Sequence, residues 1–234
     1  NNKQSFLASI SDAIFFGKRV VNEKDNTKNE TRILSIKEFR QRILRAINID
    51  SFTKYQNGNL VIDFYDPEKK VDVDKYTNTM LFSRLDMNKP EDKAYYSKVI
   101  SAYENFNSFL SDDDIIIDHT YLWDIISMPN KYLFPTGVNL VIFQIPKDDI
   151  TNNVSLLCPT NHYSSEFYQA RKPTIILMKE DGYYEPIYSY TTHNNKISII
   201  KEFKEMDPTL SKTMRAVFKE IIKPFFNTVC RPLD

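Results

Sequence analysis

The sequence predicts an α+β fold in which helices flank a small, mostly antiparallel sheet. Segments with helical periodicity come first, mostly strand-like segments follow, and one helical segment closes the chain, an order typical of α+β proteins. The apolar run "VNLVIFQI" (138–145) resembles a buried central strand. Segment 174–190 carries Asp181-Gly182 between two strand-like halves, which predicts a β-hairpin.

Composition indicates a packed globule. The chain has 234 residues, of which 41% are hydrophobic, so it fits one large domain or two small ones and can bury a sizeable core. Its 31 basic and 31 acidic residues balance, which removes the broad basic field of many nucleic-acid and membrane-surface binders. The longest apolar runs are too short to span a bilayer. Because the chain begins with Asn1 rather than Met, we expect a fragment of a longer polypeptide.

The two cysteines suggest free thiols. Cys158 and Cys230 lie far apart and neither belongs to a CxxC pair. Two distant cysteines without such a pair argue against a disulfide scaffold or a zinc site, and they suit a reducing compartment.

The N-terminal quarter is expected to contain two helices. Apolar residues at helical spacing predict a helix over 6–16 that ends at Gly17. A charged insertion then forms a polar loop over about 18–31. The capping box "SIKE" (35–38) begins a second helix that runs to about Asn48.

The rest of the helical half contains a turn, an insertion and two helices. "QNGN" (56–59) predicts the turn, and the weakly patterned, charged segment 65–90 reads as an insertion. A long helix begins at Pro90 or Glu91, and a short one covers 120–127.

Further strands are expected at "SLLC" (155–158) and "KISII" (196–200). Asp207-Pro208 predicts the start of a final helix.

No motif predicts a cofactor or a metal site, since P-loop, dinucleotide-binding and HExxH patterns are all missing from the sequence. Any imidazole base must be His119, His162 or His193. His119 directly follows Asp118 at a helix start, so a surface or capping position is expected, and His193 lies in a polar turn. Ser5 opens the first helix, where it could serve as an N-cap or as a nucleophile.

The order of elements resembles the ovarian-tumour (OTU) family of papain-like cysteine deubiquitinases. In that family a D-G-N-C-[LF]-[FY] motif places the nucleophile at a helix N-terminus, and a hairpin strand that begins G-H-Y-[DN]-S-V carries the catalytic His. Here "NKQSFL" (2–7) falls on the first motif and "GYYEPI" (182–187) on the second. The resemblance covers most, but not all, of the chain in element order, and it implies a single OTU-like domain over 1–234.

The resemblance also implies site residues. Ser5 stands at the nucleophile position, and Asn2 and Gln4 lie in the loop that supplies oxyanion donors. Tyr183 stands at the position of the family His, and Glu185 at the position of the residue that orients it. A Ser lacks the low pKa of a thiol and a Tyr is no general base near neutral pH. The sequence therefore favours an inactive OTU-like module that serves binding or architecture.

The alternative hypothesis is that the chain is an active enzyme. "NHYSS" (161–165) also looks like the His motif, with His162 as the base and Ser164 in the orienting place. If Ser5 replaces a native Cys, the chain is then an active OTU-type cysteine deubiquitinase or protease.

Partners and location are expectations of the same kind. The sequence is rich in Asn, Lys, Ile and Tyr and contains segments such as "YQNGNL" and "LFPTGVNLVIF". In this it is similar to long, partly transcription-related proteins of nucleocytoplasmic large DNA viruses. That resemblance implies a location in the host cytoplasm or the virion, and a protein partner, ubiquitin among the candidates. A role in nucleic-acid binding would use the basic residues of the second helix, which are Lys37, Arg40, Arg42 and Arg45.

Overall fold

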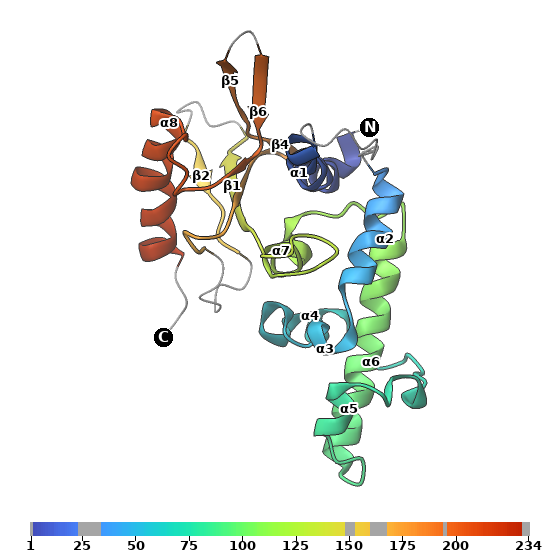
Figure 1. Ribbon diagram of the computed structural model, residues 1–234. Coiled ribbons are helices and arrows are strands. Elements are labelled where there is room, and N and C mark those ends of the chain that lie inside the picture. The colour runs from blue at the N-terminus through green and yellow to red at the C-terminus, as the bar shows by residue number, and fades with distance from the viewer. Residues whose placement is uncertain (1, 23–33, 148–152, 160–167, 194–195, 231–234) are drawn as a thin grey trace. The chain divides into compact units, whose positions relative to one another are not determined.

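The computed structural model describes residues 2–22, 34–147, 153–159, 168–193 and 196–230. These residues form two compact units (Figure 1). Unit 1 comprises Asn1–Phe39 and Ile116–Asp234, and unit 2 comprises Arg40–Ile115. The resemblance implied a single domain, whereas the described chain divides into these two units.

The sheet of unit 1 is mixed, with strand order β2-β1-β3-β4 and β7 also paired to β3. Its centre is a parallel pair of β1 (Asn139–Ile145) and β3 (Thr174–Glu180). The pairings with β2 (Ser155–Leu156), β4 (Tyr183–Pro186) and β7 (Glu202–Phe203) are antiparallel. Both central strands begin with four buried residues, which confirms the buried central strand read from "VNLVIFQI".

The predicted hairpin is confirmed. Glu180 pairs with Tyr183 across a two-residue turn, in which Asp181 adopts a φ of 53°. The chain leaves β4 after Pro186 and enters a separate two-stranded sheet of β5 (Ser189–His193) and β6 (Lys196–Ile200).

Helix α1 (Ser5–Asn22) follows a 3₁₀ turn, η1 (Asn2–Gln4), and packs against β4. Its buried residues Phe6, Leu7, Ile10 and Ile14 confirm the helical face expected there. The prediction that Gly17 ends this helix was wrong, because the helix continues to Asn22. A single glycine in a helix costs only about 1 kcal/mol, so it need not end one.

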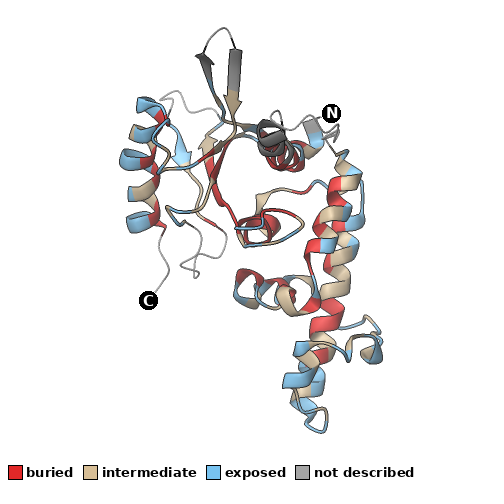
Figure 2. Cartoon of the chain, viewed as in Figure 1, coloured by how far each residue is buried: buried red, intermediate tan, exposed pale blue. Residues whose placement is uncertain are grey.

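Helix α7 (His119–Ser127) packs against β1, and Asp118 caps it by accepting the Thr120 N–H at 2.8 Å. The buried residues of α7 and β1 share one core (Figure 2), which contains the fully buried Trp123.

The C-terminal helical segment lies beside the sheet (Figure 1). It consists of α8 (Lys212–Ala216), η4 (Val217–Ile222) and η5 (Phe225–Val229), the last two π-helical. The predicted start at Asp207-Pro208 was wrong. Asp207 instead accepts the Thr209 N–H in a local turn, and Ser211 caps the helix. Pro224 separates the two π-helical stretches, as expected of a residue that lacks an N–H.

The expectation of two free thiols was also wrong. Cys158 and Cys230 form a disulfide with a Cα–Cα distance of 5.6 Å, which ties the segment after β2 to the end of the C-terminal helices. The sequence separation of 72 residues could not reveal this pairing, because cysteine spacing alone does not determine which thiols meet.

Unit 2 is helical. The capping box is confirmed, because Ser35 N donates to Glu38 at 2.8 Å and Glu38 N donates to Ser35 Oγ at 3.3 Å at the start of α2 (Ile36–Ala46). Beyond α2, the unit contains the elements α3 (Ile49–Phe52), η2 (Tyr55–Gly58), α4 (Asn59–Phe64), η3 (Val73–Tyr76), α5 (Met80–Arg84) and α6 (Pro90–Ser111).

The predicted turn and long helix of this unit are confirmed. Gln56, Asn57 and Gly58 all have positive φ, and α6 begins at Pro90. Segment 65–90 is not merely a charged insertion, since it forms η3 and α5.

Candidate functional site

Two serines of α1 form hydrogen bonds with the backbone at the outer edge of β4. Ser5 Oγ accepts the Tyr184 N–H at 2.9 Å, and Ser9 Oγ donates to the Tyr184 carbonyl at 3.4 Å. Glu180 and Tyr183 flank the hairpin turn, so the next residue, Tyr184, directs its peptide groups away from β3. Ser5 and Ser9 lie one helical turn apart, and together they satisfy the amide and the carbonyl of this edge residue.

The Tyr184 side chain is enclosed in the core. Its ring centroid lies 5.1 Å from that of Phe6 and 6.0 Å from that of His119. Tyr184 Oη lies 2.6 Å from His119 Nδ1. Burial, aided by the nearby Asp118 carboxylate, raises the pKa of the Tyr184 phenol.

His119 is a partly buried member of this cluster. Burial lowers the pKa of His119 below its ordinary value of 6.5, despite the opposing effect of Asp118. The imidazole is therefore neutral near pH 7, and its Nδ1 shares a hydrogen bond with the Tyr184 phenol. His119 also packs edge-on against Trp123, with ring centroids 5.7 Å apart.

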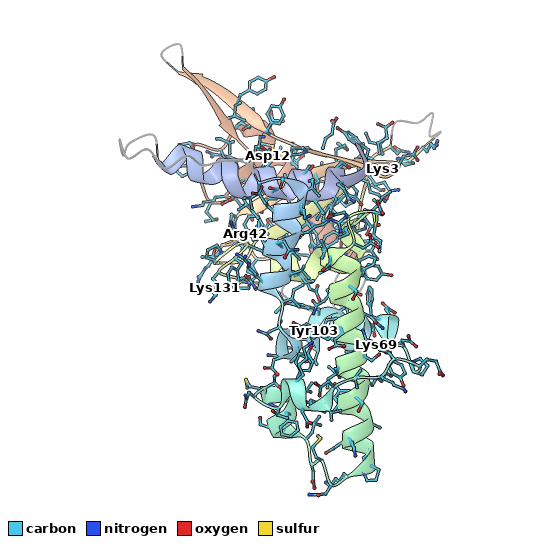
Figure 3. The ribbon with its side chains drawn as sticks, turned by 90° about the vertical axis from the view of Figure 1, so that its right-hand side faces the viewer. Lys3, Asp12, Arg42, Lys69, Tyr103 and Lys131 are labelled. Atoms are coloured by element: carbon cyan, nitrogen blue, oxygen red, sulfur yellow. A yellow bond between two sulfur atoms is a disulfide. The ribbon has the colours of Figure 1, made fainter. Side chains whose placement is uncertain are left out.

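A groove lies between α1 and β4, with a volume of about 460 Å³. We call it the α1–β4 groove. It is lined by Ser5, Ala8, Ser9, Asp12, Tyr183, Tyr184, Glu185, Pro186 and Tyr188. Asp12, labelled in Figure 3, lies on its α1 side and forms an ion pair with Lys201.

The predicted site residues gather at this groove only in part. Ser5 is buried at 8% exposure, and its described hydrogen-bond partner is the backbone of Tyr184. Tyr183 and Glu185 line the groove with outward-facing, exposed side chains. The side chain that faces inward is that of Tyr184, one residue beyond the position that the motif assigned to the family His.

The remaining predicted residues lie elsewhere or outside the described part of the chain. Gln4 Oε1 accepts the Ile117 N–H at 3.3 Å. Asn2 belongs to η1, and only its backbone is described. His162 and Ser164 lie outside the described residues, and the His193 side chain is not described.

The sequence reasoning missed His119 and Ser9. It placed His119 at the surface or in a cap, but Asp118 provides the cap and the imidazole turns to Tyr184. A signal was present in the i, i+4 spacing of His119 and Trp123 and of Ser5 and Ser9, which puts each pair on one helical face.

The basic residues of α2 do not form one exposed patch. Arg40 is 1% exposed, and its guanidinium donates to the carbonyls of Leu110 and Ile115. Lys37 and Arg45 are exposed, whereas Arg42 is half-buried. The hypothesis of a four-residue nucleic-acid patch on this helix was therefore wrong for Arg40.

Within the described ranges, His, Cys, Asp and Glu side chains form no cluster of three or more suited to a metal ion. No helix in that part of the chain has the length and apolar character needed to cross a membrane. Comparison with protein-family models, curated proteins and solved structures found no match to the chain. The site is therefore defined by its own geometry: a groove whose candidate nucleophile is bonded to the strand beside it.

Proposed function

We propose that the chain is a catalytically inactive module with an OTU-like arrangement, which binds a protein partner through the α1–β4 groove. One observation carries this proposal: Ser5 Oγ accepts the Tyr184 N–H at 2.9 Å. A serine nucleophile must also give its own proton to a base within hydrogen-bond reach, and the hydrogen bond described for Ser5 is to backbone rather than to such a base. Here the neighbouring imidazole, His119, is engaged with the Tyr184 phenol.

The groove surface supports a binding role. Tyr183 is 38% exposed and Tyr188 49% exposed, and both line the groove. Aromatic side chains are enriched at protein interfaces because they bury much apolar area at a low cost in side-chain entropy.

The wider setting is part of the same proposal: the module belongs to a larger viral protein and ubiquitin is one candidate partner. The disulfide between Cys158 and Cys230 supports the virion rather than the host cytoplasm, because disulfides persist in oxidising surroundings.

A ubiquitin-based suicide probe tests the loss of catalysis. The native chain and its Ser5→Cys variant should both remain unlabelled at position 5. The rival function, an OTU-type cysteine protease with His162 as base, requires that Ser5→Cys be labelled and that His162→Ala remove the label. That pair of results would overturn the proposal.

Selection from a random peptide library displayed on phage tests the binding role. Peptides should be enriched on the native chain and lost on the Tyr183→Ala/Tyr188→Ala variant. The Tyr95→Ala variant provides the matched control, because Tyr95 is a similarly exposed tyrosine in unit 2, at 44%. If no enriched peptide depends on Tyr183 and Tyr188, the groove is not a binding site.

A further inference from the structure

The α1–β4 groove continues into an exposed aromatic surface. Tyr190 is 66% exposed, and its ring centroid lies 5.9 Å from that of Tyr188. Tyr188 and Tyr190 stand two residues apart, as side chains on one face of an extended segment do. Three tyrosine rings and a proline ring therefore lie together. Tyr183, Pro186 and Tyr188 line the groove, and Tyr190 lies beside it.

The backbone beside the groove is closed to an added strand. A peptide that extends a sheet needs free N–H and C=O groups on the edge strand. The outward amide and carbonyl of Tyr184 are bonded to Ser5 and Ser9, and Pro186 has no N–H to offer. Recognition through backbone pairing on β4 is therefore blocked.

The charge of the groove favours a basic ligand over an acidic or phosphorylated one. Such ligands are held by clusters of arginine or lysine. The charged residues that line the groove are Asp12 and Glu185, both acidic. Lys201 lies beside the groove, where it is paired with Asp12 and its Nζ lies 5.9 Å from the Tyr188 ring centroid. The Glu185 side chain is exposed, so a ligand cation would meet its carboxylate.

We propose that the occupant of the α1–β4 groove is an extended, proline-rich segment that carries a lysine or arginine. This inference rests on the proposed function and specifies the chemistry of its partner. Proline-rich segments adopt a preformed polyproline helix without internal hydrogen bonds. They pack their rings between aromatic side chains and need no edge strand. Their basic residue pairs with Glu185 at the rim.

Fluorescence anisotropy of labelled peptides tests this assignment on the full chain. The probe is a peptide of about ten residues, all proline except for an arginine at each end. Two controls replace the terminal arginines with glutamates, or the prolines with alternating glycine and serine. The proline–arginine peptide should bind at least about tenfold more tightly than either control. Equal binding of all three peptides, or binding of none, overturns the inference.

Variants locate the binding. Tyr183→Ala and Tyr188→Ala should each weaken binding by about tenfold, and Tyr95→Ala should leave it unchanged. Glu185→Gln should reduce the preference for arginine over glutamate at the peptide ends while the preference for proline remains. All these side chains are exposed, so the variants should keep the native circular dichroism spectrum. If Tyr183→Ala and Tyr188→Ala bind as the native chain does, the proposed site is wrong.

The outcome also separates this inference from the proposed function. Groove-dependent phage peptides that lack proline and basic residues would overturn the ligand class and leave the binding role intact. The absence of any groove-dependent peptide would overturn both.

Discussion

The hydroxyl of Ser5 accepts the backbone N–H of Tyr184 at 2.9 Å, across 179 residues of sequence. This bond joins the first turn of α1 to the edge of β4. Ser5, which the resemblance described above assigns to a nucleophile position, therefore has a structural role.

Ser5→Ala should lower the free energy of unfolding by about 1–3 kcal/mol, because the buried Tyr184 amide loses its acceptor. Ser9→Ala should cost less, since its bond is longer at 3.4 Å. Urea unfolding followed by circular dichroism measures both. Ser108→Ala, at an exposed serine of α6, is the control and should be nearly neutral. A Ser5→Ala variant as stable as the native chain would show that the hydroxyl has no structural duty.

Tyr184→Phe should also destabilise the protein, by about 1–2 kcal/mol, because the partly buried His119 Nδ1 loses its hydrogen-bond partner. The ring contact with Phe6 is kept in this variant, so the loss reports the hydrogen bond. The control is Tyr183→Phe on the same strand, where the ring is exposed and little change is expected. Equal stability of the two variants would contradict the His119–Tyr184 bond.

The stability of unit 1 should depend on the protonation of His119. Burial lowers the pKa of His119 from 6.5, so the unfolded chain binds this proton more tightly than the folded chain does. The resulting stability is present above about pH 6.5 and is lost as the pH falls below it. Urea unfolding across this range should show a shallower pH slope for His119→Gln, which keeps an acceptor but cannot titrate. Identical slopes in the two proteins would refute the assignment.

Reduction of the disulfide between Cys158 and Cys230 should destabilise the protein by about 2–4 kcal/mol, since an unlinked chain gains entropy on unfolding. Thermal unfolding with and without dithiothreitol measures the effect. The Cys158→Ser/Cys230→Ser variant should unfold at the lower temperature under both conditions. If dithiothreitol does not lower the unfolding temperature of the native chain, the two sulfur atoms are not bonded.

Arg40→Met should destabilise unit 2 by about 2 kcal/mol or more, because the carbonyls of Leu110 and Ile115 lose a charged donor. Arg45→Met, at an exposed position on the same helix, should change stability by less than about 0.5 kcal/mol. Chemical unfolding of the two variants makes the comparison. Similar stabilities would place the Arg40 guanidinium in solvent and reopen its use in nucleic-acid binding.

Local patterns predicted much of the secondary structure. The apolar period of 138–145, the Asp181-Gly182 turn, the Ser35–Glu38 capping box and the start of α6 at Pro90 all match the structure. Each depends on residues that lie within a few positions of one another. Two boundaries were missed. At Gly17 a weak stop signal did not end α1, which continues to Asn22. Asp207 closes a local turn, and the helix begins later, after Ser211.

The candidate site was predictable only in part. The sequence singled out Ser5 and the strand that faces it. The motif placed Tyr183 at the position of the family His, and local patterns cannot decide which side chains of that strand face the core. A shift of one residue in a strand moves a side chain to the opposite face, and here Tyr184 is the buried residue. The spacing of His119 and Trp123 indicated a shared helical face, but no local pattern could reveal that the imidazole bonds Tyr184, 65 residues away.

By itself, the sequence determined several of the helices, the central strand, the hairpin and the position of Ser5 at a helix start, since periodicity and turn chemistry act over short distances. Only the tertiary structure decided which groups meet: Ser5 and Ser9 with the Tyr184 backbone, His119 with its phenol, and Cys158 with Cys230. These pairings arise when buried polar groups and thiols find partners as the core forms. Their identity depends on the packing of distant segments rather than on neighbours in the chain.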